Sequence, residues 1–163
     1  IWGSTYLSET IGLSADMAAA LITFYFAGIT LGRFFSGLLS LKFSDWKIII
    51  LGQSAILIAV CILLLTDRTE PAVFGLFLIG LGNGPVFPNM THLTPVLYKK
   101  ETSQSIIGIE MAFSNLSIML TPVLFGFVSG IWGTEIFPVF LAVMFVLMAG
   151  CTIVLKIGDS KSR

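Results

Sequence analysis

The chain has 163 residues, of which 56% are hydrophobic and only 11% are charged, whereas about 25% of the residues in an ordinary soluble domain are charged. This composition excludes a soluble globular enzyme. Nine Lys and Arg residues balance nine Asp and Glu residues, so no surplus charge points to nucleic acid or to an acidic soluble partner. We therefore expect the lipid bilayer, small solutes, ions and other helices as partners.

Five apolar blocks are each long enough to cross the roughly 30 Å hydrocarbon core of a bilayer. They predict an all-α fold, a polytopic membrane helical bundle, with spans at about 15–40, 48–66, 72–98, 103–130 and 136–155. Residues 1–7, with Trp2 and Tyr6 suited to an interfacial aromatic belt, predict the end of a sixth helix. Because the connections are short, successive helices should pack antiparallel.

The positions of lysine and arginine predict the orientation, because short basic loops stay in the cytoplasm. The basic residues gather in alternate connections and in the tail, at Lys42, Lys47, Lys99, Lys100, Lys156, Lys161 and Arg163. The other connections contain one basic residue, Arg68, among several acidic ones. We expect an integral protein of the cell membrane, with its carboxy terminus in the cytoplasm.

Three ionisable residues lie inside the predicted spans, where a charged group costs about 2.5–3.5 kcal/mol on insertion scales. Arg33, His92 and Glu110 are all about 10 Å from the cytoplasmic face, at about 1.5 Å of rise per residue. In one interpretation Arg33 and Glu110 form a structural ion pair, and His92 makes an ordinary hydrogen bond. In the other they form a cytoplasmic gate or proton relay, since conformational change alters the protonation of a carboxylate beside cationic groups.

Asn83 and Asn115 form a second polar layer near the centre of the bilayer, about eleven or twelve residues into their predicted helices. Their amides either bond neighbouring helices, which is worth about 0.6–2 kcal/mol, or contact a solute that carries hydroxyl groups. Thr23 and Thr30 flank the same depth but are weaker candidates, because threonine also bonds its own backbone.

The span at 72–98 contains the run Gly80-Leu-Gly-Asn-Gly-Pro-Val-Phe-Pro-Asn89. Proline removes a backbone donor and kinks a helix, and spans interrupted by glycine and proline mark binding sites or hinges in transporters. Pro85 and Pro88 are therefore the predicted hinge. Three GxxxG pairs favour close helix packing, namely Gly28 with Gly32, Gly80 with Gly84, and Gly126 with Gly130.

The sequence offers no set of residues for catalysis. It contains one histidine, no GxxxxGK[ST] loop, and no nucleophile with a base and an orienting group. Cys61 and Cys151 lie in apolar blocks, where we interpret them as core or lipid-facing residues. We expect no enzyme activity, no catalytic residues, no metal and no cofactor.

Three features resemble one family of transporters. Gly32-Arg33 with Gly37, Lys42 and Asp45 resembles the second copy of the loop motif G-x-x-x-D-[RK] of the major facilitator superfamily, although Leu41 occupies its acidic position. The Gly80–Pro88 run resembles helix 10 of that family, and Pro122-x-x-x-Gly126 resembles its helix 11. The whole chain, 1–163, looks like the carboxy-terminal half, from the end of helix 7 through helix 12. More loosely, it is similar to the fucose/glucose permease-like sugar–proton symporters.

This resemblance implies a secondary active transporter that works by alternating access, with the amino-terminal half outside this sequence. The solute would be a sugar or another polyhydroxylated compound, and a proton would be the coupling ion. We assign solute binding to Asn83, Asn115, Tyr6 and Thr30, coupling or gating to Glu110, Arg33 and His92, and the hinge to Pro85 and Pro88. The alternative is a non-transporting membrane scaffold or regulator with the same fold, in which apolar side chains fill the mid-membrane layer.

Overall fold

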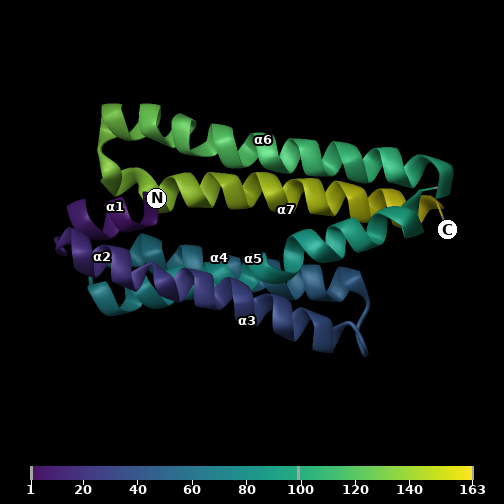
Figure 1. Ribbon diagram of the computed structural model, residues 1–163, viewed down its shortest axis with the longest axis horizontal. Coiled ribbons are helices and arrows are strands. Elements are labelled where there is room, and N and C mark those ends of the chain that lie inside the picture. Colours follow the sequence, from purple (N-terminus) through teal and green to yellow (C-terminus); the bar gives the residue numbers. More distant parts are fainter. Residues whose placement is uncertain (1, 99, 163) are drawn as a thin grey trace.

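The computed structural model describes residues 2–98 and 100–162, and within these ranges the chain forms helices and no strand (Figure 1). Lys99 and Arg163, on which the orientation prediction partly depends, lie outside the described residues. The elements in chain order are α1 (Trp2–Glu9), α2 (Ala15–Leu21), α3 (Thr23–Leu39), α4 (Asp45–Leu65), α5 (Thr69–Leu97), α6 (Lys100–Trp132), η1 (Thr134–Ile136) and α7 (Phe137–Ser162).

Five described segments are long and apolar enough to cross a membrane, which confirms the predicted number of spans. They are Ala15–Leu39, Asp45–Leu65, Thr69–Leu97, Thr102–Trp132 and Thr134–Ser160. Helix α1 covers most of the opening residues, for which the sequence predicts helix. The first span differs from the prediction of one helix, because it is divided at Ile22 into α2 and α3.

Helix α5 is the centre of the most closely packed part of the bundle, because α3 and α4 both pack along it. A Cβ atom added to Gly84 of α5 would lie 2.7 Å from the Ile29 carbonyl oxygen of α3. Gly28 and Gly32 of α3 have equally close backbone neighbours in α5, and Gly80 has them in α3. The close packing predicted for the first two GxxxG pairs is therefore confirmed.

The third glycine pair behaves differently. Gly126 of α6 lies against the Trp2 ring, with 3.3 Å between a Cβ built on it and the nearest ring atom. Gly130 has nothing within 4 Å of such an atom. Close helix packing at Gly130 is therefore a wrong prediction for the described part of the chain, since no atom there approaches the position that a Cβ would take.

Helices α6 and α7 both run along the upper side of the bundle in Figure 1, and α7 packs mainly against α4. Helix α7 is joined to α4 by two side-chain bonds, from Gln53 Nε2 to Thr152 Oγ1 at 2.6 Å and from Trp46 Nε1 to Asp159 Oδ2 at 3.0 Å. Near α1, an apolar cluster that includes Tyr6, Leu7 and Phe125 connects the layers.

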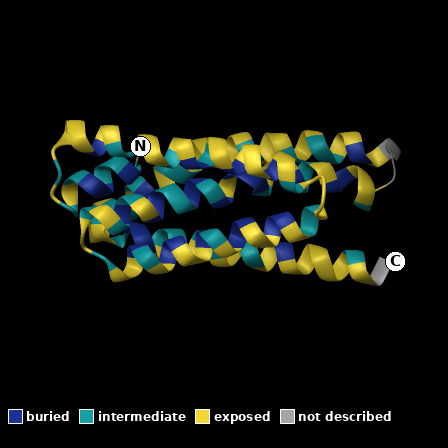
Figure 2. Cartoon of the chain, turned by 90° about the horizontal axis from the view of Figure 1, so that it is seen from below, coloured by how far each residue is buried: buried dark blue, intermediate teal, exposed yellow. Residues whose placement is uncertain are grey.

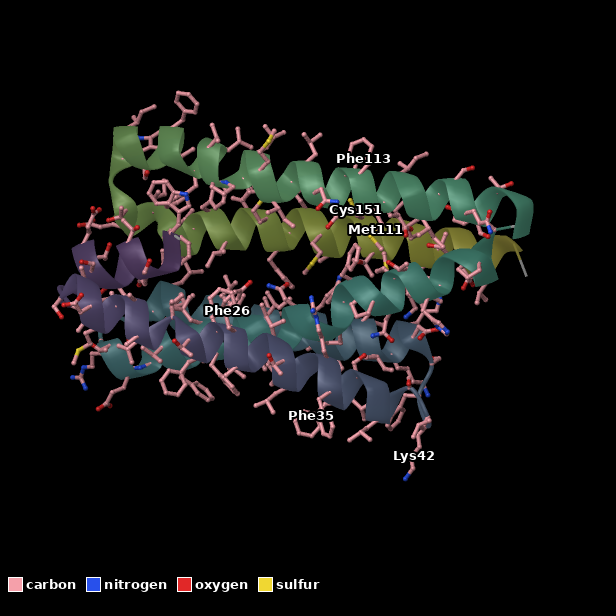
Figure 3. The ribbon with its side chains drawn as sticks, viewed as in Figure 1. Phe26, Phe35, Lys42, Met111, Phe113 and Cys151 are labelled. Atoms are coloured by element: carbon pink, nitrogen blue, oxygen red, sulfur yellow. The ribbon has the colours of Figure 1, made fainter. Side chains whose placement is uncertain are left out.

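The outward faces of the helices are largely exposed and apolar, whereas buried residues lie along their inner faces (Figure 2). Phe35 of α3 and Phe113 of α6 point away from the bundle on opposite sides (Figure 3). Such faces suit contact with lipid. Burial is also uneven between helices, because 44% of the most apolar part of α5 is buried but only 6% of that of α6.

Candidate functional site

A groove between α3, α5 and the start of α4 brings several polar side chains together. It encloses about 540 Å³. Its lining residues are Arg33, Ser36, Gly37, Ser40, Asp45, Phe87, Pro88, Asn89 and His92. The structure thus brings Arg33 and His92 to one groove, as their predicted common depth suggests, and adds Asp45 to them.

His92 and Asp45 form an ion pair when the imidazole is protonated, with 3.0 Å between Nδ1 and Oδ2. The His92 side chain is 74% exposed, whereas that of Asp45 is 18% exposed. Asp45 is in the first turn of α4, where the positive end of the helix dipole favours a carboxylate. The pair therefore ties the start of α4 to the second half of α5.

Helix α5 changes direction beyond its middle (Figure 1), where Pro85 and Pro88 interrupt its backbone bonding. Asn89 supports this bend. Its Nδ2 atom lies 2.6 Å from the Pro85 carbonyl oxygen and 2.7 Å from Ser36 Oγ of α3, and donates to both. Because Asn89 is only 5% exposed, these bonds satisfy an amide that would otherwise be costly to bury.

Glu110 lies apart from the groove and bonds Thr94 of α5. The Thr94 hydroxyl oxygen is 2.7 Å from Glu110 Oε1, and Glu110 Oε2 is buried without a hydrogen-bond partner. Within the described residues, Glu110 and Arg33 do not form the ion pair that one interpretation of the sequence requires. The Glu110 carboxylate meets α5 at Thr94, whereas Arg33 lies with His92 in the groove.

The predicted solute-binding residues occupy two kinds of environment. Asn83 is exposed at the midpoint of α5 and has the Tyr25 hydroxyl as a hydrogen-bonding neighbour. Asn115 is exposed near the middle of α6, where its Nδ2 atom donates to the Met111 carbonyl oxygen at 2.9 Å. Thr30 is exposed and donates to the Phe26 carbonyl oxygen of its own helix at 3.0 Å.

Tyr6 differs from the other three, because it is 2% exposed and packs on Phe137 with 5.2 Å between ring centroids. In this conformation it belongs to the apolar cluster near α1 and is not open to a solute. The structure therefore does not bring Tyr6 together with the two asparagines.

Sequence reasoning missed Ser36, Asn89 and Thr94 as parts of the polar network. Asn89 is four residues after Pro85, so its side chain falls over the turn that the proline disrupts. That spacing is the one signal that could have identified it. Among the residues that the structure describes, no three His, Cys, Asp or Glu side chains are grouped as for a metal.

Comparison with known proteins gives one match. The family model described as the Major Facilitator Superfamily matches residues 1–162. A search of curated proteins and a search of solved structures each find no match.

Proposed function

The chain belongs to the Major Facilitator Superfamily, and from this we propose that it is the carboxy-terminal half of a transporter for a sugar or another polyhydroxylated solute. The family makes it part of a secondary transporter in a membrane. We further propose that transport proceeds by alternating access, that a proton is the coupling ion, and that the amino-terminal half completes the pathway. This last point fits the low burial of α6, which leaves a face for another set of helices.

The exposed amides of Asn83 and Asn115 are the observation that carries this proposal. Each lies near the middle of a helix of membrane-spanning length and has no apolar cover within the described chain. A polar group at this depth is unfavourable against lipid and normally faces a cavity or a partner. The two amides therefore mark the side of the bundle that faces the pathway.

The chemistry of this layer suits hydroxyl groups. An amide both donates and accepts hydrogen bonds, as a sugar hydroxyl does. Asn83 stands beside the Tyr25 hydroxyl, and Thr30 adds a second hydroxyl on α3. The groove of Arg33 and His92 lies further along the same two helices, where we propose a gate on the cytoplasmic side.

The hinge of the transport cycle is proposed at Pro85 and Pro88. Pro85 lies two residues after Asn83, and Pro88 lines the groove of Arg33 and His92. A change of angle there would move the gate relative to the solute layer. The helix bends more easily at the prolines because each of them removes a backbone hydrogen bond. The hydrogen bond from Asn89 to Ser36 would then stabilise the angle that α5 has in this structure.

Leucine substitutions in the full-length protein test the solute layer. Asn83→Leu and Asn115→Leu should each weaken solute binding about tenfold, since a lost hydrogen bond is worth about 0.5–1.5 kcal/mol. Membrane abundance should stay near that of the parent, because leucine suits a span. Binding is measured on purified protein with a panel of sugars and polyols.

Ser54→Leu is the matched control, because Ser54 is also exposed near the middle of a span and bonds only the Ile50 carbonyl of its own helix. It should leave binding unchanged. If the asparagine variants lose abundance and binding equally, the amides serve packing instead. If no polyhydroxylated solute binds the parent protein, the scaffold alternative is favoured.

A further inference from the structure

We propose that the solute is a sugar in its ring form, and that Phe26 of α3 provides the aromatic surface on which one face of that ring lies. Tyr25, the preceding residue, holds the Asn83 amide in one orientation beside this surface. Both assignments rest on the proposed function, since they require that a polyhydroxylated solute reaches Asn83. They narrow that class to cyclic sugars and add two residues to the site.

Tyr25 and Asn83 meet because the backbones of α3 and α5 touch close to them. A Cβ atom added to Gly80 would meet the Tyr25 carbonyl oxygen and would lie 3.0 Å from the Ile29 amide nitrogen. Asn83 follows Gly80 by three residues, so it projects from the same side of α5. The Tyr25 hydroxyl and the Asn83 side chain are hydrogen-bonding neighbours there. The contact between the two backbones thus fixes the position of this pair.

The hydrogen bond to Tyr25 restricts how Asn83 can meet a solute. A free amide can turn over and exchange its donor and acceptor ends, because the two ends have nearly the same shape. A bond to a neighbouring hydroxyl favours one of these orientations, and the remaining donor and acceptor positions of the amide then form a fixed pattern. Tyr25 is therefore a positioning residue, which acts on the solute through Asn83.

Phe26 presents an exposed aromatic ring beside this pair. Its ring packs on that of Tyr25, with 5.3 Å between the centroids and 69° between the planes, and the side chain is 57% exposed. Phe26 and Phe35 are nine residues apart, about two and a half helical turns, so they lie on opposite faces of α3 (Figure 3). Phe35 points away from the bundle, on a face suited to lipid. The exposed Phe26 ring therefore belongs to the other face of α3, beside the polar pair.

An aromatic ring beside an amide suits one kind of polyhydroxylated solute. A sugar in ring form has C–H groups on its faces and hydroxyl groups around its edge, so a face can pack on an aromatic ring while the edge bonds an amide. An open-chain polyol has no such face, and it loses more conformational freedom when it is bound. The combination of Phe26 with Asn83 therefore favours the cyclic sugar.

Thr30 adds a hydrogen-bond acceptor to the same face of α3. It follows Phe26 by four residues, and its hydroxyl donates to the Phe26 carbonyl oxygen at 3.0 Å. The hydroxyl hydrogen is used in this bond, but the oxygen can still accept a bond from a sugar hydroxyl. Because Thr30, Tyr25 and Asn83 are all uncharged, the solute layer suits a neutral ring better than an anion.

Matched pairs of cyclic and open-chain solutes test the ring preference on the purified full-length protein. Equilibrium binding is compared for glucose with sorbitol, galactose with galactitol, and mannose with mannitol. For the pairs that bind, the sugar should bind about three- to tenfold more tightly than its hexitol, the range expected for one aromatic contact.

Phe26→Leu should lower the affinity for these sugars about three- to tenfold and leave that for the hexitols nearly unchanged. Phe26→Tyr keeps an aromatic ring and should retain the preference, so it answers the question even where Phe26→Leu fails to accumulate. Phe35→Leu is the matched control, because the same side chain is exposed on the opposite face of α3. It should leave both affinities unchanged.

Tyr25→Phe tests the positioning role, because it removes the hydroxyl and keeps the ring. It should weaken sugar binding about three- to tenfold, but it should have little further effect in protein that already carries Asn83→Leu. A merely structural role would give the same change in both backgrounds. Tyr98→Phe is the control, since Tyr98 lies at the carboxy-terminal end of α5, away from the solute layer.

Equal binding of sugars and hexitols by the parent protein overturns the ring preference and leaves the proposed function standing. Equal effects of Phe26→Leu and Phe35→Leu overturn the role of Phe26. An undiminished effect of Tyr25→Phe in the Asn83→Leu background overturns the positioning role of Tyr25. If neither sugars nor hexitols bind the parent protein, the proposed function fails, and the ring preference fails with it.

Discussion

At the scale of single residues, Asn89 connects the bend of α5 to α3. Its amide bonds both the Pro85 carbonyl oxygen and the Ser36 hydroxyl, and it is almost fully buried. A bond between helices inside a membrane protein is worth about 0.6–2 kcal/mol. The residue therefore joins the bend of α5 to α3 through buried hydrogen bonds.

We predict that Asn89→Ala lowers the stability of the full-length protein by about 1–2 kcal/mol, because it leaves Ser36 unpaired and removes the support of the bend. Thermal unfolding in detergent, without solute, measures the change. Asn115→Ala is the comparison, since Asn115 is exposed and bonds only its own helix. An equal loss in both variants would show that Asn89 has no special structural role.

The partners of individual side chains were the least predictable feature. Counting residues from a helix end places Arg33, His92 and Glu110 at one depth, and two of them do share a groove. Counting residues does not show which neighbouring helix each side chain faces. Glu110 therefore meets Thr94 on α5 instead of Arg33, a pairing that depends on helix rotation and side-chain conformation.

At the scale of helices, the glycines of α3 and α5 allow the two backbones to meet directly. A Cβ atom on Gly84 would lie 2.7 Å from the Ile29 carbonyl oxygen and 2.9 Å from the Arg33 amide nitrogen. Both neighbours are backbone atoms, so relief requires movement of a whole helix. This contact brings the backbone of Arg33, a residue of the groove, directly against α5.

We predict that Gly84→Ala destabilises the protein by about 1–3 kcal/mol, the usual cost of overpacking a close contact. Gly150→Ala in α7 is the matched control, because an added Cβ there meets nothing within 4 Å. Alanine favours a helix over glycine by about 0.8–1.0 kcal/mol, so the control should be neutral or slightly stabilising. Thermal unfolding of both purified variants provides the measurement, and similar melting temperatures would contradict the close contact.

The helices themselves were predictable because a bilayer imposes a length on every span. The five apolar blocks correspond to five described segments of spanning length. The break at Ile22 could not be foreseen, since neither glycine nor proline occurs there. A GxxxG pattern likewise shows that one face of a helix carries small residues. It does not show whether a neighbouring helix packs on that face, as Gly130 illustrates.

At the scale of the whole molecule, the distribution of charged residues predicts the orientation across the membrane. Thr69 begins α5 and Thr102 lies in the first turn of α6, so a complete span separates them. The sequence predicts that Thr69 is outside and Thr102 is in the cytoplasm. The structure contains no membrane, and labelling in cells tests this prediction.

We predict that a cysteine at Thr69 reacts with an impermeant thiol reagent added to intact cells, and that a cysteine at Thr102 reacts only after the cells are opened. Cys61 and Cys151 are first replaced by alanine, because both are exposed and free. Labelling of the cysteine-free parent provides the background. The opposite pattern would reverse the orientation and move the groove of Arg33 and His92 to the outer side.

The difference in burial between α5 and α6 also affects how the protein assembles in the membrane. Helices α3, α4 and α5 carry their own glycine-lined contacts, so they can associate once all three have entered the bilayer. Helix α6 enters later with little of its surface covered by this chain, and its exposed Asn115 amide stays open to lipid until other helices of the full-length protein pack against it. Incompletely packed protein is exposed to degradation in cells. Cellular lifetime should then depend more on how quickly α6 is covered than on the strength of the α3–α4–α5 core.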